Sequence, residues 1–422
     1  MKLHNLKIAT EQVNFRQAVI QGIGKERGLF FVNQFKPLAN LDEILAMDFV
    51  ERSSHIIHHL IDGELTLEKV TEMVSNAFNF EVPMVEVTEN TTCLELFHGQ
   101  TLAFKDFGAR FMAQCVKVFN DKKQITILTA TSGDTGAAVA HAFYKIAGIK
   151  VKILYPKGKI SNLQEKLFCT LGANIETYAV EGDFDDCQTM VKAAFDSEEI
   201  RNKHHLTSAN SINISRLLAQ VCYYFEIVSK YYDDNLVVSV PSGNFGNLTA
   251  GLIARQIGAP IKRFIAATNA NDTVPRYLIE NTWLPNKTIE TVSNAMDVSD
   301  PSNWPRIMSL FNNDLDELKQ VVSATIKTDD QTFEAMRELQ QLGYIAEPHT
   351  AIAYAGLLES LQEDEQGIFV STAHPAKFIE TVEEVLDIKI PLPEALSDVK
   401  DKHNLSIDIS NDTELFNQML LK

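Results

Sequence analysis

A single lysine stands inside the stretch 96–111, with Phe104 directly before it and Phe107 two residues after it. The apolar residues that follow have helical spacing, so we expect the amine of Lys105 at the start of a helix, in a partly apolar and enclosed setting. Desolvation disfavours the ammonium form, and a neutral lysine amine can form a Schiff base with a carbonyl compound. The structural alternative is a lysine that extends its charged end to solvent.

A glycine-rich turn, Pro-Ser-Gly-Asn-Phe-Gly-Asn at 241–247, lies between an expected strand at 236–240 and an expected helix at 248–257. Backbone N–H groups at such a helix start can surround a phosphate, and Gly243 and Gly246 permit its close approach. The turn fits neither the dinucleotide fingerprint nor the P-loop pattern. It predicts phosphate binding without specifying the ligand, and an ordinary strand-to-helix turn is the alternative.

Two more polar clusters precede expected helices. Ala-Thr-Ser-Gly-Asp-Thr-Gly at 130–136 follows an expected strand, and its hydroxyls can donate to carboxylate or phosphate oxygens; Asp134 can equally be a helix N-cap. The stretch 207–216 offers amides, hydroxyls and Arg216, whose planar fork suits a phosphate ester. Its alternative is a capped helix start with a surface arginine.

Other candidates indicate structure rather than chemistry. A strand-like stretch, 367–375, ends in hydroxyls and His374, which we interpret as a structural histidine. Residues 22–28 lack the Gly-Lys-Ser/Thr ending of a phosphate loop and are interpreted as a turn. No third metal ligand accompanies the histidines of the expected helix at 41–59, which are His55, His58 and His59. We therefore predict no metal site.

The composition limits the classes of function. The 422 residues are 45% hydrophobic and 22% charged, with a formal net charge of −18, which argues against a nucleic-acid partner. Five scattered cysteines without metal-site spacing indicate a reducing, cytoplasmic compartment. The first residues lack a signal peptide pattern, and no run approaches the ~18 apolar residues of a membrane span. We expect neither secretion nor membrane insertion.

The element pattern predicts an α/β protein. From about residue 93, apolar β-branched runs alternate with helical patterns, which is typical of parallel sheets covered by helices. The length suggests more than one lobe. We expect an N-terminal α/β domain over 1–90 and a catalytic region over 91–422, with a smaller α/β subdomain at about 106–205 nested in a larger one. Residues 282–305 are interpreted as a loop or insertion.

Five motifs occur in one order: FHGQTLAFKDFGARF, TATSGDTGAA, SANSINISR, PSGNFGN and STAHPAKF. Together with the N-terminal MKLHNLK, they resemble the threonine synthases of the longer, bacterial and fungal type. These are pyridoxal phosphate (PLP) enzymes of fold type II, the tryptophan synthase β-like family. The resemblance covers nearly the whole chain and departs visibly only at Gln100, where a proline is usual.

The resemblance implies roles for individual residues. Lys105 would bind PLP covalently, Thr372 would hydrogen-bond the pyridine nitrogen, and Asp134 would lie near the phenolic oxygen of the cofactor. The PLP phosphate would be held by Gly243, Asn244, Phe245, Gly246 and Asn247. The phosphate and carboxylate of the substrate would be received by Ser132, Thr135, Asn210, Ser211 and Arg216.

The reaction implied is that of a carbon–oxygen lyase acting on phosphates. O-phospho-L-homoserine would lose its γ-phosphate, and water would add at the β-carbon to give L-threonine. Two alternatives remain: another fold type II enzyme, such as a threonine dehydratase or a cysteine synthase, and a non-catalytic relative that binds a phosphorylated metabolite. We expect a monomer or a weak homo-oligomer.

Overall fold

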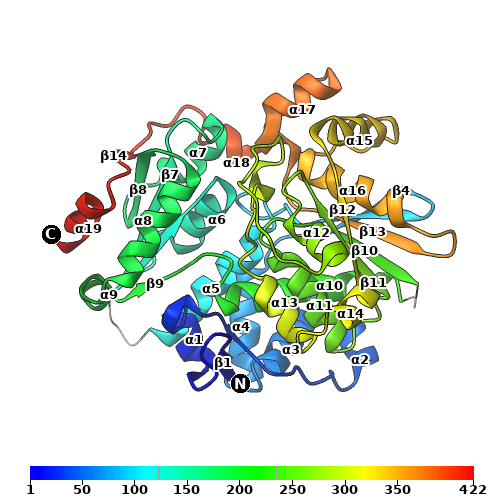
Figure 1. Cartoon of the computed structure of the whole chain (residues 1–422), viewed down its shortest axis with the longest axis horizontal. Helices are drawn as coiled ribbons and strands as arrows, with labels where there is room; N and C mark the ends of the chain where they lie inside the picture. The colour runs from blue at the N-terminus through cyan, green and yellow to red at the C-terminus, as the bar shows by residue number, and fades with distance from the viewer. Residues whose placement is uncertain (121–123, 233–234) are drawn as a thin grey trace.

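The computed structural model describes residues 1–120, 124–232 and 235–422 of the chain. Two α/β lobes, each built on a mainly parallel sheet, lie side by side, and the N-terminal elements lie along one side of them (Figure 1). The predicted fold class is therefore confirmed. No helix among the described residues is long and apolar enough to cross a membrane.

The large lobe contains a six-stranded sheet in the order β12-β11-β10-β13-β5-β4, in which only the edge strand β4 is antiparallel. Its strands are β4 (Met84–Thr88), β5 (Thr91–Glu95), β10 (Leu236–Pro241), β11 (Arg263–Thr268), β12 (Val322–Ile326) and β13 (Gln366–Ser371). Its helices are α10 (Ile214–Lys230), α11 (Gly246–Gln256), α12 (Thr273–Glu280), α13 (Trp304–Leu310), α14 (Leu315–Val321), α15 (Asp329–Gln341), α16 (Pro348–Ser360) and α17 (Ile379–Leu386).

Both faces of the large sheet are buried, which explains the continuous apolar sequence of β10. Side chains alternate between the two faces of a strand. Val238 packs in the core cluster that includes α10 and α11, whereas Val237 packs in the cluster that includes α15 and α16. A central parallel strand needs apolar residues on both faces for this reason.

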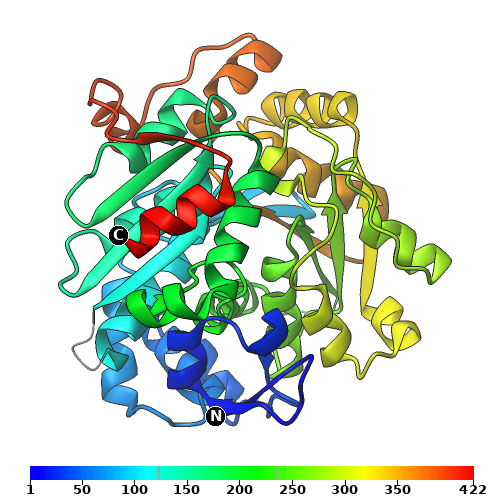
Figure 2. The ribbon, with the colours of Figure 1, turned by 60° about the vertical axis from the view of Figure 1, so that its left-hand side comes forward.

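The small lobe contains an all-parallel sheet in the order β14-β8-β7-β6-β9. Its strands are β6 (Ile125–Ala130), β7 (Ile149–Pro156), β8 (Ile175–Glu181), β9 (Leu206–Thr207) and β14 (Ile407–Ser410). Its helices are α6 (Asp134–Phe143), α7 (Asn162–Cys169), α8 (Phe184–Asp196), α9 (Glu198–His204), α18 (Glu394–Ser397) and α19 (Thr413–Leu421). The end of the chain thus returns to this lobe, where α19 packs against α8 (Figure 2).

The N-terminal elements share a core with the rest of the chain. A small antiparallel sheet is formed by β1 (Lys2–Asn5), β2 (Gln12–Asn14) and β3 (Phe30–Phe31). The helices are α1 (Phe15–Gln21), α2 (Leu41–Leu45), α3 (Phe49–Leu60) and α4 (Leu67–Ala77). Side chains of α1, α3 and α4 join the core cluster of α5 (Lys105–Phe119). The division at residue 90 stays a prediction.

The apolar stripe expected after Lys105 lies in α5. Phe107, Phe111, Cys115 and Phe119 are all buried there, as their spacing predicts. The ring of Phe107 packs edge-on against Tyr223 of α10, with the ring centroids 5.2 Å apart. This packing fixes α5, and with it the position of Lys105. The expected helix over 41–59 is wrong in one respect, because residues 46–48 interrupt it between α2 and α3.

We expect Phe111→Ala to lower the free energy of unfolding by about 3–5 kcal/mol, because it removes a fully buried ring from the core beside α4. Urea denaturation followed by circular dichroism measures the change. Leu342→Ala, at a position whose side chain is exposed, is the control and should cost less than about 1 kcal/mol. Equal losses in the two variants would contradict this account of the core.

Candidate active site

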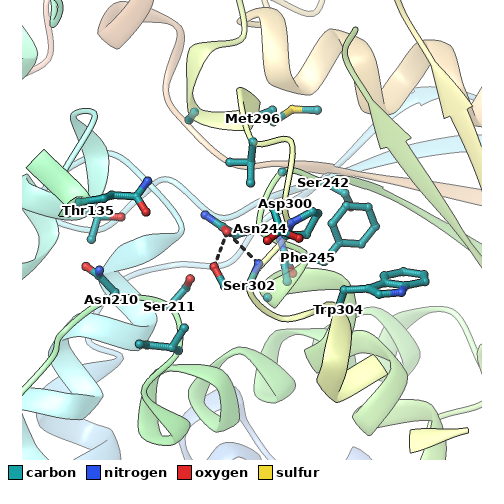
Figure 3. Close-up of a pocket in the computed structure, with 18 of the residues that line it drawn as sticks. Thr135, Asn210, Ser211, Ser242, Asn244, Phe245, Met296, Asp300, Ser302 and Trp304 are labelled. Atoms are coloured by element: carbon teal, nitrogen blue, oxygen red, sulfur yellow. Dashed lines mark hydrogen bonds between the residues drawn. The ribbon is translucent and has the colours of Figure 1, made fainter. Parts of the chain in front are cut away.

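A cavity of about 900 Å³ is lined by residues of both lobes. All thirteen residues that the sequence analysis selected line it: Lys105, Ser132, Asp134, Thr135, Asn210, Ser211, Arg216, Gly243, Asn244, Phe245, Gly246, Asn247 and Thr372. In Figure 3, Thr135, Asn210 and Ser211 lie on one side of the open space, and Ser242, Asn244 and Phe245 lie on the other. Their roles remain predictions, although the fold brings them together.

Lys105 is the first residue of α5 and its side chain is mostly buried. Desolvation lowers the pKa of its amine, and the positive charges of Lys377 and Arg216 act in the same direction, whereas Asp134 opposes them. The pKa of Lys105 is lowered on balance. A larger fraction of neutral amine is available at neutral pH than for an exposed lysine, as carbonyl chemistry requires.

Backbone pairing places Thr372 beside Lys105. Phe104 N donates to Thr372 O at 2.9 Å, and His374 N donates to Leu102 O at 3.0 Å. The residues directly before α5 therefore pair with the residues directly after β13. His374 caps the following 3-10 helix by accepting from Ala376 N and lies outside the cavity lining, which supports its interpretation as a structural residue.

Asp134 is buried at the start of α6 and lies between two lysines. Its Oδ1 is 2.5 Å from Lys377 Nζ, and its Oδ2 is 3.7 Å from Lys105 Nζ. Burial alone would raise the pKa of Asp134, but the two cations outweigh it and lower the pKa to about 2. Asp134 is therefore a carboxylate at neutral pH. Lys377 belongs to the STAHPAKF motif, but the sequence predicts no role for it.

The turn at 242–245 leaves backbone donors available beside the start of α11. Among the described residues, the N–H groups of Gly243, Asn244 and Phe245 donate to no carbonyl. The first N–H groups of a helix have no partner inside it, so those of α11 are also available. Phe245 has a φ of 59° and turns the chain into the helix. A phosphate would satisfy these donors.

Close packing holds this turn in place. A Cβ at Gly243 would lie 2.7 Å from Met296 Cα, so only glycine fits beneath the 294–298 segment. The Asn244 side chain accepts from Ser302 Oγ at 2.8 Å (Figure 3). Asn247 Oδ1 accepts from the hydroxyls of two tyrosines of α10, Tyr223 and Tyr224, while its Nδ2 is buried without a partner. That unsatisfied donor indicates a missing acceptor in the cavity.

Arg216 supplies a further cation to the cavity lining. Arg216, near the start of α10, is 3% exposed, and burial lowers its pKa to about 10, so it remains a cation at neutral pH. It donates to Ala209 O, and its Nε is buried without a partner. The loop before it is held by Asn213, which caps α10 and donates to Val19 O of α1 at 3.0 Å. An anion would find a cation and the polar side chains of Asn210 and Ser211 here.

The loop after β6 is shaped by Thr131. Its hydroxyl accepts from Gly133 N at 2.9 Å and from Gly136 N at 2.8 Å, which folds the chain back on itself before α6. A Cβ at Gly136 would lie 2.6 Å from the Thr131 side chain. The fold thereby turns Ser132 and Thr135 toward the cavity, where both are half-buried.

The sequence did not predict a role for the segment 294–302 or for a buried pair at the start of α16. The segment lines the cavity beside the phosphate turn, although it was interpreted only as a loop or insertion. His349 Nε2 accepts from Ala295 N at 3.2 Å, and its Nδ1 lies 2.5 Å from Glu347 Oε2. The pair of His349 and Glu347 therefore helps to hold the 294–302 segment in place. The polar composition of the 294–302 segment was the only sequence signal that it could belong to the site.

These features define a class of site. A buried amine with a lowered pKa binds a carbonyl compound, and a cradle of free N–H groups binds a phosphate. The unpartnered Asn247 Nδ2 and the free N–H groups of the turn fit a phosphate-bearing carbonyl cofactor. PLP is such a cofactor, and this arrangement on two α/β lobes is typical of PLP-dependent enzymes.

Comparison with known proteins also identifies the chain as a PLP-dependent enzyme. The family described as "Pyridoxal-phosphate dependent enzyme" matches residues 92–372, and "Threonine synthase, C-terminal" matches residues 350–420. The threonine synthase of Haemophilus influenzae is 57% identical and covers 100% of both chains. That of Escherichia coli is 56% identical over 97% of this chain and 98% of its own.

Solved structures extend the likeness to the whole fold. The crystal structure of threonine synthase from Escherichia coli superposes with a TM-score of 0.96 and 54% identity, covering 100% of this chain and 99% of that one. PLP-bound threonine synthase from Brucella melitensis gives 0.93 with 28% identity, covering 100% and 98%. The chain belongs to the PLP-dependent enzymes and, within them, to the threonine synthase family.

We expect Gly243→Ala to weaken PLP binding at least about tenfold, a free-energy change of about 1.4 kcal/mol or more. The added methyl group would collide with Met296 Cα and displace either the turn or the 294–298 segment. Titration of the cofactor-free chain with PLP, followed by visible absorbance, measures the dissociation constant. Gly158→Ala is the control: its φ of 71° strains an alanine backbone, but a Cβ there has nothing within 4 Å and Gly158 lies outside the cavity lining, so PLP binding should not change. Unchanged binding in Gly243→Ala would contradict the assignment of the turn.

Proposed function

We propose that the protein converts O-phospho-L-homoserine and water into L-threonine and inorganic phosphate. The observation that carries the proposal is that one cavity is lined by Lys105, by the free N–H groups of the turn and by the buried Arg216 with its unpartnered Nε. The turn at 243–247 suits the cofactor phosphate, and Arg216 with its neighbours suits the phosphate or carboxylate of the substrate.

The chain's own residues divide the work. Lys105 would hold the cofactor until the substrate amine replaces it, and its freed Nζ would then take the α-proton. When bound, PLP supplies the electron sink that stabilises the resulting carbanion. The Thr372 hydroxyl would hydrogen-bond the ring nitrogen without forcing its protonation, which favours elimination and replacement over transamination. Asp134 would lie on the same side as Lys105, near the phenolic oxygen.

The polar residues of the opposite wall would orient the substrate. We assign Ser132, Thr135, Asn210, Ser211 and Arg216 to its phosphate and carboxylate. A hydroxyl leaving group, as in a dehydratase, needs no buried arginine, and an acetyl leaving group needs none either. If Arg216 receives the leaving phosphate, its burial with an unpartnered Nε favours the phosphorylated substrate over both alternatives, whereas the carboxylate is common to all three substrates.

We propose a cytoplasmic location, because all five cysteines are buried free thiols rather than disulfides. We also propose that the protein acts as a monomer or a weak homo-oligomer. The thirteen residues assigned to the site all belong to one chain, which supports this proposal. The net charge of −18 gives a nucleic acid no general attraction to the chain.

Lys105→Ala should reduce phosphate release from O-phospho-L-homoserine by at least about a thousandfold, because it removes both the covalent attachment and the amine that moves the proton. A coupled colorimetric phosphate assay gives the rate. Borohydride reduction followed by mass spectrometry should show bound PLP on the unaltered chain and none on the variant. Lys117→Ala, on an exposed position of the same helix, should retain both properties. A variant at residue 105 that keeps its turnover would refute the assignment.

Arg216→Ala should raise KM for O-phospho-L-homoserine at least about tenfold, because a charge-assisted contact to an anion is worth about 1.5–3 kcal/mol. PLP binding should stay within about twofold, since the cofactor phosphate is assigned to the other position. Steady-state kinetics and PLP titration provide the two values. Arg255→Ala, outside the cavity lining, is the control. If KM for phosphohomoserine is unaffected in Arg216→Ala, the substrate assignment fails.

A further inference from the structure

Lys377 connects the two lobes beside the reactive lysine. It belongs to the 3-10 helix Pro375–Phe378, which follows β13 of the large lobe, and it is only 1% exposed. Its Nζ donates to Thr101 O at 2.8 Å and lies 2.5 Å from Asp134 Oδ1. Asp134 begins α6 of the small lobe. A fully buried ion pair therefore crosses from one lobe to the other at the catalytic lysine.

Two cations share one carboxylate at this point. Lys377 Nζ is 2.5 Å from Oδ1 of Asp134, whereas Lys105 Nζ is 3.7 Å from Oδ2. Coulomb attraction falls with distance, so the closer lysine is the stronger partner. Lys377 also has a second acceptor in Thr101 O, which holds its amine in place. Lys105 is consequently left with a long contact to an anion that is already paired.

We propose that Lys377 is a positioning residue for the proposed reaction: it holds Asp134 at the boundary between the lobes and prevents Asp134 from forming a close ion pair with Lys105. The inference rests on the proposed role of Lys105 as the reactive amine. A buried carboxylate without a partner is strongly unfavourable. Without Lys377, Asp134 would turn to Lys105 and hold it as an ammonium ion, which cannot attack a carbonyl group.

The charges around both groups give the sign of the effect. Lys105 faces Asp134 of α6, Lys377 of the 3-10 helix and Arg216 of α10; Asp134 faces the two lysines and His349 of α16. Burial lowers the pKa of Lys105, Asp134 raises it, and Lys377 lowers it. Removing the charge of Lys377 therefore raises the pKa of Lys105. Each unit of increase reduces the neutral amine tenfold at a pH below the pKa.

The test measures the pKa of Lys105 directly in the full chain freed of cofactor. Each sample is labelled with limiting acetic anhydride at a series of pH values from about 6 to about 11. Mass spectrometry then measures the acetylated fraction of the Lys105 peptide, and its dependence on pH gives the pKa. Lys377→Gln keeps a polar N–H donor for Thr101 O but removes the charge, and it should raise the pKa of Lys105 by about one unit. Lys377→Arg keeps the charge and should leave the pKa near that of the unaltered chain.

Lys327→Gln is the matched control. Lys327 is also a buried lysine of the large lobe, paired with Glu359, but it lies outside the cavity lining. This variant should not change the pKa of Lys105. The inference is overturned if Lys377→Gln leaves the pKa of Lys105 unchanged. If Lys377→Gln does not fold, Lys377→Met, which removes the same charge from a side chain of similar length, carries the test: it must raise the pKa of Lys105, and an unchanged value overturns the inference.

The same samples separate this inference from the proposed function. In the unaltered chain, PLP should protect Lys105 from acetylation, and the loaded enzyme should release phosphate from O-phospho-L-homoserine. Failure of either result, together with a shifted pKa in Lys377→Gln, would refute the proposed function and leave the role of Lys377 intact. An unchanged pKa of Lys105 in Lys377→Gln, together with PLP protection and phosphate release in the unaltered chain, would refute the role of Lys377 alone.

Discussion

The desolvation of one amine is the constraint on which the other features of this structure depend. Burial keeps the pKa of Lys105 low, but a buried lysine must be held by packing rather than by a close counter-ion. The aromatic contact between Phe107 and Tyr223 and the backbone pairing of residues 102–104 with 372–374 provide this support. The carboxylate nearest to Lys105 is at the same time engaged by another lysine.

The two lobes contribute different parts of the cavity. The large sheet supplies the phosphate turn after β10 and Thr372 after β13, because the carboxyl ends of parallel strands meet at one edge. The small sheet supplies the loop after β6, with Ser132, Asp134 and Thr135. A ligand that touches both walls is therefore held between two bodies, and their relative position affects its binding.

The N-terminal segment contributes Leu6, Lys7, Ile23, Arg27 and Leu29 to the cavity lining and also supports the site from behind. Arg306, fully buried, donates to Phe30 O at 3.0 Å and to Ile212 O at 2.7 Å, and Asn213 donates to Val19 O. The polar loop before α10 is thus tied to the first 31 residues by three hydrogen bonds. A segment without a chemical motif of its own still determines where Arg216 and its neighbours lie.

The sequence by itself determined the local features: the apolar stripe of α5, the glycine turn before α11, the hydroxyl clusters at strand ends and the order of motifs that resembles threonine synthase. These depend on residue type and short-range spacing, which periodicity and turn chemistry report. Only the tertiary structure decided that β14 completes the small sheet, that the segment 294–302 and His349 adjoin the phosphate turn, and that Lys377 meets Asp134. Lys377 and Asp134 are 243 residues apart in the chain, and no local pattern records which distant charges share one buried volume.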